Sequence, residues 1–108
     1  METAKQLAIP LPMDAIENFC QRWQIAELSV FGSILRDDFN ANSDIDFLYI
    51  LKPNIQWRLV DLLSAEEELA KLLGRKIDLV KKSSVEQSHN WLRKQNILSS
   101  SQVIYDSK

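Results

Sequence analysis

Two aspartates, Asp44 and Asp46, stand two positions apart at the start of one of the most apolar runs of the chain. In a strand, side chains two residues apart point to the same face, so the two carboxylates lie side by side while Ile45 and Phe47 face the other way. Two like charges this close repel each other unless a cation lies between them. A divalent metal ion held by oxygen ligands resolves the repulsion most simply. The alternative is a plain pair of surface aspartates where a loop meets a strand.

The aspartate pair ends a longer motif. Gly32-Ser33 follows an apolar run and suits a turn into a helix, Arg36 comes three residues after Ser33, and ten residues separate Ser33 from Asp44. This pattern of Gly-Ser, Arg and Ser-Asp-x-Asp, followed by apolar residues, resembles the nucleotidyltransferase superfamily that includes DNA polymerase beta. A Gly-Ser turn alone is common, so the resemblance depends on its spacing from the aspartates.

More closely, the chain from about residue 16 to residue 105 resembles the minimal nucleotidyltransferase (MNT) domains, which act as antitoxins beside HEPN-domain toxins. The resemblance implies an enzyme that transfers AMP from ATP to a tyrosine of a HEPN ribonuclease toxin and thereby silences the toxin. It implies Mg²⁺ as the cofactor, with two ions in the site. It also implies that antitoxin and toxin form a hetero-oligomeric complex.

Three carboxylates make up the metal site that the resemblance implies. Asp44, Asp46 and Asp78 are the metal ligands in this interpretation. The family places a third acidic residue on a neighbouring strand, and this residue can also help to deprotonate the attacking hydroxyl. Asp78 lies in an otherwise apolar strand, where an unpaired charge is costly. The alternative is that Asp78 pairs with Arg75 or Lys76, or lies at an exposed strand end.

The nucleotide-binding residues that the resemblance implies are Gly32, Ser33 and Arg36. Glycine lets the backbone approach the triphosphate closely, and the N–H groups at the start of the following helix favour anions. Arg36 either contacts the β- or γ-phosphate or pairs with an acidic neighbour such as Asp37.

Composition limits the classes of protein that the chain can be. With 108 residues, 45% hydrophobic and 26% charged, we expect one globular domain over residues 1–108 with a flexible lead-in at 1–12. The net charge is −2, and residues 1–52 hold 4 Lys/Arg against 8 Asp/Glu, which suits a metal site better than direct nucleic-acid binding. A single cysteine, Cys20, excludes a disulfide framework. Without a membrane-spanning stretch, we expect a cytoplasmic protein.

The order of predicted elements indicates an α/β (α+β) fold, with one small mixed sheet flanked by helices. A leucine-rich face on the longest helix, which includes Leu59 and Leu63, is expected to be buried. Gly74 suits the left-handed end of that helix. A capping box at Ser83-x-x-Glu86 opens the last helix, residues 99–101 form a loop, and the last strand lies at an edge. The predicted helices are 13–23, 33–38, 56–73 and 83–95, and the predicted strands are 27–31, 43–51, 76–80 and 102–105.

The acceptor of the nucleotide divides the functional hypotheses. At 108 residues we expect no second domain that would hold an acceptor, and we therefore expect another polypeptide to present the acceptor or to be the acceptor. The first alternative is a purely binding antitoxin that masks the toxin without chemistry. The second is transfer to a small molecule such as an aminoglycoside.

Other polar and aromatic residues point more weakly to function. His89 is expected to be a solvated surface residue, and Trp57 and Trp91 to be packing or interface residues. Lys81-Lys82 follows a predicted strand and is expected to be a solvated strand end.

Overall fold

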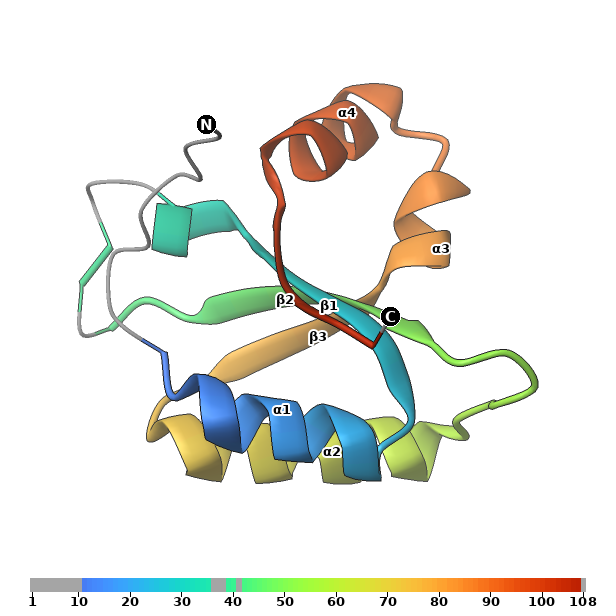
Figure 1. Ribbon diagram of the computed structural model, residues 1–108. Helices are drawn as coiled ribbons and strands as arrows, with labels where there is room; N and C mark the ends of the chain where they lie inside the picture. The colour runs from blue at the N-terminus through green and yellow to red at the C-terminus, as the bar shows by residue number, and fades with distance from the viewer. Residues whose placement is uncertain (1–10, 36–38, 41, 108) are drawn as a thin grey trace, which may run out of the picture.

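A mixed sheet of four strands, in the order β3-β2-β1-β4, lies at the centre of the computed structural model (Figure 1). The structure describes residues 11–35, 39–40 and 42–107, with Ser33 described by its backbone alone. β2 is parallel to β3, whereas β1 is antiparallel to both β2 and β4. The predicted fold class is confirmed, with β4 at an edge as expected. The elements in chain order are α1 (Met13–Arg22), β1 (Ile25–Phe31), the 3-10 helix η1 (Gly32–Leu35), β2 (Ile45–Leu51), α2 (Leu59–Leu73), β3 (Ile77–Lys81), α3 (Lys82–Glu86), α4 (Trp91–Ser100) and β4 (Gln102–Asp106).

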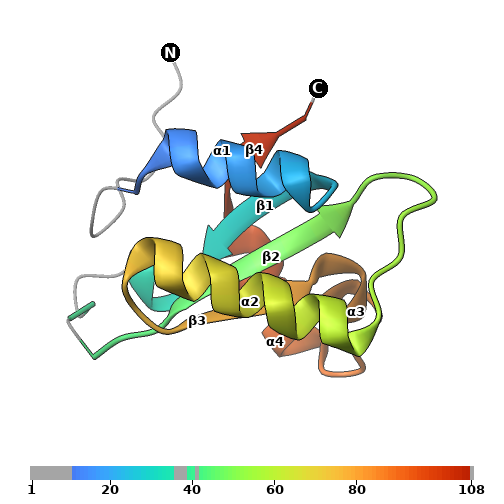
Figure 2. The same cartoon turned by 90° about the horizontal axis from the view of Figure 1, so that it is seen from below.

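Helices cover both faces of this sheet. α1 and α2 lie against one face, and α3 and α4 lie against the other, as Figures 1 and 2 show. Successive residues of β2 divide between the two sides: Phe47 is buried in the main core with α1 and α2, whereas Leu48 is buried in a smaller cluster with Val85 of α3 and Ile97 of α4. Because side chains alternate along a strand, Asp46 shares the face of Leu48.

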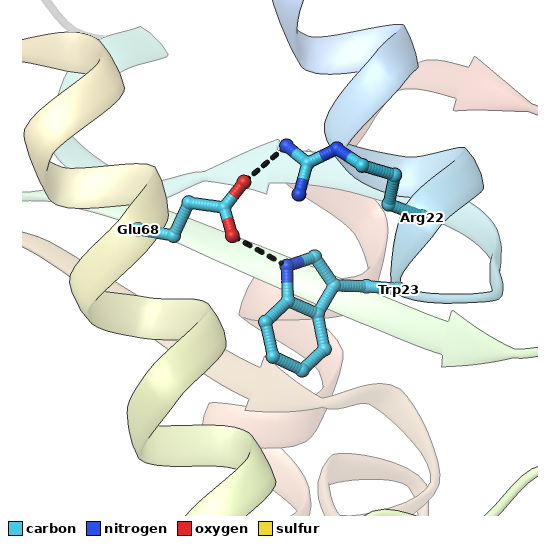
Figure 3. Close-up of polar contacts among 3 residues, drawn as sticks. All are labelled: Arg22, Trp23 and Glu68. Atoms are coloured by element: carbon cyan, nitrogen blue, oxygen red, sulfur yellow. Dashed lines mark hydrogen bonds and ion pairs between the residues drawn. The ribbon is translucent and has the colours of Figure 1, made fainter.

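The carboxylate of Glu68 on α2 joins this helix to α1 (Figure 3). It accepts hydrogen bonds from the guanidinium of Arg22 and, at 3.0 Å, from Nε1 of Trp23. The hydrogen bond from Arg22, helped by that from Trp23, holds the pKa of Glu68 below its ordinary value. Trp57 is a packing residue, as predicted: its ring stacks on Tyr49 with 4.8 Å between centroids, and its Nε1 donates to the carbonyl of Trp23 at 3.3 Å.

The long helix differs from its prediction in its start and in its buried face. It begins at Leu59 rather than residue 56, because the carboxylate of Asp61 accepts the backbone N–H of Arg58 at 2.8 Å and defines the first turn. Leu59 is 72% exposed and Leu63 54% exposed, so the expectation that these leucines are buried was wrong. Leu59 and Leu63 lie on a different side of the helix from the stripe of residues that contacts the sheet. Leu62, Ala65 and Leu69 form that stripe.

The predicted helix 83–95 is two helices. α3 follows β3 directly at Lys82, so Ser83 lies inside α3 and the predicted capping box does not form. A turn at 87–90 separates it from α4, where the side chain of Asn90 caps the helix by accepting the N–H of Arg93 at 3.1 Å. α4 continues to Ser100, through most of the segment predicted as a loop.

The Glu68 junction leads to a prediction about stability and pH. The pKa of Glu68 is lowered in the folded state, so its contribution to stability is present above the ordinary value of 4.5 and is lost as the pH falls through the lowered folded value. We expect Glu68→Gln to lower the melting temperature at pH 7. Its neighbour Glu67 makes an ion pair with Lys71 between two largely exposed side chains, and Glu67→Gln is the matched control with little effect.

Thermal unfolding of both variants between pH 3 and 7 checks this prediction. We expect the gap between Glu68→Gln and the unsubstituted protein to narrow as the pH falls below 4.5. Equal melting temperatures for the two variants at pH 7 would show that the junction adds no stability.

Candidate active site

Two of the predicted metal ligands lie directly opposite each other on neighbouring strands. In the parallel pairing of β2 with β3, the partner of Asp46 is Asp78. Paired residues of adjacent strands point to the same face, and the strands lie about 4.8 Å apart, so the two side chains stand next to each other. Asp46 is half-buried and Asp78 is exposed. The structure therefore places Asp46 and Asp78 side by side on two separate strands. Their role as metal ligands stays a prediction.

Asp44 lies just before β2, which begins at Ile45 rather than at residue 43. The N–H of Ile45 donates to the carbonyl of Lys76 at 3.2 Å, which fixes the chain directly after Asp44 against the segment that leads into β3. Ile45 is fully buried, whereas Asp44 is exposed and Asp46 half-buried. This alternation places Asp44 and Asp46 on the same face, next to the Asp78 position.

Arg75 holds the loop that leads into Asp44. Its guanidinium donates to the carbonyls of Asn40 at 3.2 Å and Ser43 at 2.9 Å, and it lies 4.7 Å from the centroid of the Phe39 ring. The alternative in which Arg75 pairs with Asp78 is not what the structure shows, and within the described residues Asp78 has no ion pair. The sequence analysis did not identify this role, because nothing in the segment Arg75-Lys76-Ile77-Asp78 indicated that Arg75 contacts a loop more than 30 residues away.

Gly32 follows β1 and touches the carboxylate of Asp46. Phe31 pairs with Asp46 across the antiparallel ladder, and Gly32 has a positive φ of +80° that side chains rarely adopt. A Cβ atom built on Gly32 would lie 2.5 Å from Oδ2 of Asp46, closer than two such atoms approach. Glycine is therefore required here both by the turn and by the close approach of the acidic side chain.

The donor set fits a hard divalent cation. Carboxylate oxygens are the ligands that Mg²⁺ prefers. Within the described residues, no three carboxylate, histidine or cysteine side chains converge tightly enough to enclose one ion. Like charges repel, so the side chains of such a group converge only around a cation. The backbone places Asp44, Asp46 and Asp78 on one face of the sheet.

A pocket of about 280 Å³ opens beside Asp46 and Gly32. Phe31 and Ile97 form its apolar part. Helix α4 supplies the polar remainder, namely Arg93, Asn96 and Ser100. The sequence analysis missed this contribution. The spacing of i, i+3, i+4 and i+7 over these three residues and Ile97 was a signal that they share one helix face, but nothing in the sequence indicated what that face would meet.

Some of the predicted residues lie outside the part of the chain that the structure describes. Arg36 lies in the segment 36–38, outside the described residues, as do Ala41 and residues 1–10 of the predicted lead-in. The predicted helix 33–38 is described to Leu35, as the 3-10 helix η1. Ser33 is placed by its backbone within η1.

The residues with weaker signals do not line the pocket beside Asp46. His89 is exposed in the turn before α4, rather than on a helix, and fits its predicted surface role. Trp91 is 64% exposed on α4, and its role as an interface residue stays a prediction. Lys81 is exposed at the end of β3, whereas Lys82 pairs with Glu27 at 3.6 Å.

The contact between Gly32 and Asp46 leads to a second prediction. Gly74 is the matched control, since it ends α2 with a φ of +68°, as predicted, and a Cβ there would meet nothing within 4 Å. We expect Gly32→Ala and Gly74→Ala each to lose about 1 kcal/mol of unfolding free energy from the positive φ. Gly32→Ala alone should weaken binding of a divalent cation, because the methyl group displaces the Asp46 carboxylate from its place beside Asp78.

Urea unfolding and titration with Mn²⁺ measure the two effects separately. Equal Mn²⁺ affinities in the two alanine variants would contradict the requirement for a close approach at Gly32.

Comparisons with known proteins show the family to which this chain belongs. Residues 13–104 match the family model described as nucleotidyltransferase domain. The protein adenylyltransferase MntA of Thermococcus cleftensis is 37% identical over 65 residues, which cover 60% of this chain and 64% of MntA. A Methanocaldococcus jannaschii relative, provisionally named a protein adenylyltransferase, is 34% identical over 77 residues, 71% of this chain and 74% of the relative.

Solved structures share the fold. A toxin–antitoxin complex with AMP-PNP matches with a TM-score of 0.69 at 18% identity, over 91% of this chain and 76% of the other. The complex of tri-AMPylated Shewanella oneidensis HEPN toxin with MNT antitoxin matches with a TM-score of 0.60 at 16% identity, over 88% of this chain and 70% of the other. These likenesses confirm the architecture that the resemblance implied. The chain belongs to the nucleotidyltransferase domain family.

Proposed function

We propose that this nucleotidyltransferase is a metal-dependent antitoxin that transfers AMP from ATP to a tyrosine of a cognate HEPN ribonuclease toxin. The observation that carries the proposal is the pairing of Asp46 with Asp78 in register, with Gly32 against the Asp46 carboxylate. The names of the relatives support AMP as the transferred group and a protein as the acceptor. The structural neighbours that are toxin–antitoxin complexes support a toxin as the partner.

The chemistry is the replacement of pyrophosphate on the α-phosphorus of ATP. The acceptor oxygen forms a bond to the α-phosphorus, the bond from that phosphorus to the bridging oxygen breaks, and pyrophosphate leaves with the electron pair. Asp78, which is exposed on the edge strand β3, takes the proton from the acceptor hydroxyl. Bound Mg²⁺, held by Asp44, Asp46 and Asp78, would supply charge that stabilises the entering and leaving oxygens.

The residues around Gly32 position the nucleotide in this proposal. Gly32 has no side chain to exclude the triphosphate, and it stands next to the Asp46 carboxylate. We assign Ser33 and Arg36 to the phosphates from their place in the motif. Arg75 acts indirectly, as a positioning residue that fixes the loop before Asp44 through the carbonyls of Asn40 and Ser43.

A protein acceptor fits the surface beside the site. Two large apolar side chains at the start of α4 are exposed, Trp91 at 64% and Leu92 at 63%, and they directly precede in sequence Arg93, which lines the Asp46 pocket. Exposed apolar groups of this size mark surfaces that contact other proteins. Docking of the toxin there would hold its tyrosine near Asp78, and such positioning contributes much of the rate in transfer reactions.

Several expectations from the sequence remain predictions. Within the described residues, no helix is both long and apolar enough to cross a membrane. A cytoplasmic location, a single domain over residues 1–108, two Mg²⁺ ions and the absence of direct nucleic-acid binding stay predictions.

Transfer of label from ATP tests the proposed function. The purified chain is incubated with Mg²⁺, the HEPN-domain protein encoded beside it, and ATP labelled at either the α- or the γ-phosphate. We expect the α-label but not the γ-label on the toxin, and we expect the label on a tyrosine. Asp46→Asn should reduce transfer by about 100-fold or more, because the lost metal charge contributes several kcal/mol to the transition state.

Asp14→Asn on α1 is the matched control, since Asp14 is exposed on the opposite side of the sheet, and it should transfer at the normal rate. Unfolding curves of Asp46→Asn should match those of the unsubstituted protein or show a slight gain, since a clustered like charge is removed. Full neutralisation of the toxin by Asp44→Ala/Asp46→Ala without label would instead identify a purely binding antitoxin. Label on an added aminoglycoside and not on the toxin would identify a small-molecule transferase.

A further inference from the structure

We propose that Arg93 of α4 is a substrate-binding residue that holds the β- and γ-phosphates of ATP in the pocket beside Asp46. This inference rests on the proposed function and extends it to a helix outside the Gly-Ser and Asp-x-Asp motif. It assigns the second wall of the nucleotide site to α4, opposite the carboxylates of the sheet.

The first observation is that α4 and the carboxylate site line one pocket. Arg93 and Asn96 line the same pocket of about 280 Å³ as Gly32 and Asp46. Nucleotide-sized ligands occupy pockets of about 300–1,000 Å³, so this hollow takes part of a nucleotide and not all of it. The part that belongs beside metal-binding carboxylates is the phosphate chain.

The second observation is that the structure fixes the orientation of α4. Ile97 is 9% exposed and packs with Phe31 and Leu48 of the sheet, which sets the rotation of the helix. The side chain of Asn90 accepts the N–H of Arg93 at 3.1 Å, which fixes where the helix begins. Arg93 and Asn96 lie four and one residues before Ile97, on the same helix face, so they meet the pocket in a defined register.

The third observation concerns charge. Asp44, Asp46 and Asp78 carry three negative charges on one sheet face, and a nucleoside triphosphate brings more. Among the described residues that line the pocket, Arg93 is the one cation, and within the described part of the chain it forms no ion pair. A guanidinium is always charged and presents a planar fork of donors that matches phosphate oxygens, so it can offset charge on the phosphates that the metals do not reach.

The polar neighbours of Arg93 fit the same assignment. The hydroxyl of Ser100 donates to the carbonyl of Asn96 at 2.6 Å and is committed to the helix. The side chains of Arg93 and Asn96 are therefore the donors that α4 offers to the pocket. Arg93 and Lys94 also line a neighbouring hollow of about 150 Å³. The test therefore has to distinguish binding of ATP beside Asp46 from binding in this second hollow.

The test compares the affinities of ATP and AMP in matched variants. The complete chain is titrated by calorimetry with Mg²⁺ and either an ATP analogue whose α–β bridge cannot be cleaved, or AMP. Arg93→Gln removes the charge at nearly constant volume. Lys94→Gln is the control, because the neighbouring cation lines the second hollow and not the Asp46 pocket.

We expect Arg93→Gln to weaken binding of the ATP analogue by about tenfold, the size of one lost charge-assisted contact, and to leave AMP binding unchanged. Arg93→Lys should recover part of the affinity, since it keeps the charge but loses the fork. Lys94→Gln should bind both ligands normally, and circular dichroism should show that each variant is folded.

Several results would overturn the proposal. Normal ATP affinity in Arg93→Gln would exclude contact with the phosphates, and it would leave the proposed function intact as long as the unsubstituted protein binds ATP. Equal losses for ATP and AMP, or equal losses in the Arg93 and Lys94 variants, would assign Arg93 to the fold or to general surface charge. Failure of the unsubstituted protein to bind the ATP analogue would reject this proposal and the proposed function together.

Discussion

The register between β2 and β3 is the constraint on which the site depends, because it sets Asp46 beside Asp78. Two like charges in this position are unfavourable, so the register has to be imposed from elsewhere. The neighbouring pairs impose it: Ile45 pairs with Ile77, and Phe47 pairs with Leu79, and all four side chains are buried against α1 and α2. A shift of one residue would turn the aspartates into the core and the apolar residues out to solvent. Hydrophobic burial on one face thus holds the acidic pair on the other.

The two faces of the sheet accordingly differ in what they contribute. The face under α1 and α2 holds the larger core and the Glu68 junction, and these fix the strands. The face under α3 and α4 has a smaller apolar cluster, which leaves room for Gly32 and Asp46 to line a pocket. β2 belongs to both faces, because its buried and acidic residues alternate. In the proposed function, the side with the larger core positions the metal ligands, and the side with the pocket admits the substrate.

Much of this arrangement was predictable from the sequence, for physical reasons. The alternation of Asp44, Ile45, Asp46 and Phe47 predicted one acidic and one buried face of the strand. The place of Asp78 beside the acidic pair was implied by the resemblance to the family, since the residues alone also allowed an ion pair or an exposed strand end. Gly32 was expected to let the backbone approach a triphosphate, but its close approach to the Asp46 carboxylate was not predicted, because it depends on the pairing of β1 with β2. By contrast, the split between α3 and α4 depends on a turn at 87–90 and on an Asn90 cap, which local propensities did not separate from a continuous helix. The roles of Arg75 and Arg93 depend on tertiary contacts with segments far away in the sequence, and no local pattern indicates such partners.

The location of bound metal tests the central claim most directly. Mn²⁺ broadens the NMR signals of nearby amides, so a substoichiometric amount, added with an ATP analogue that cannot be cleaved, reports where the ion lies. We expect the amide signals of Gly32, Asp44, Asp46 and Asp78 to broaden first, while those of α1 and the first turns of α2 stay sharp. Broadening centred on the acidic run Glu66–Glu68 of α2, or spread evenly over the surface, would contradict a metal site made by the register of β2 and β3.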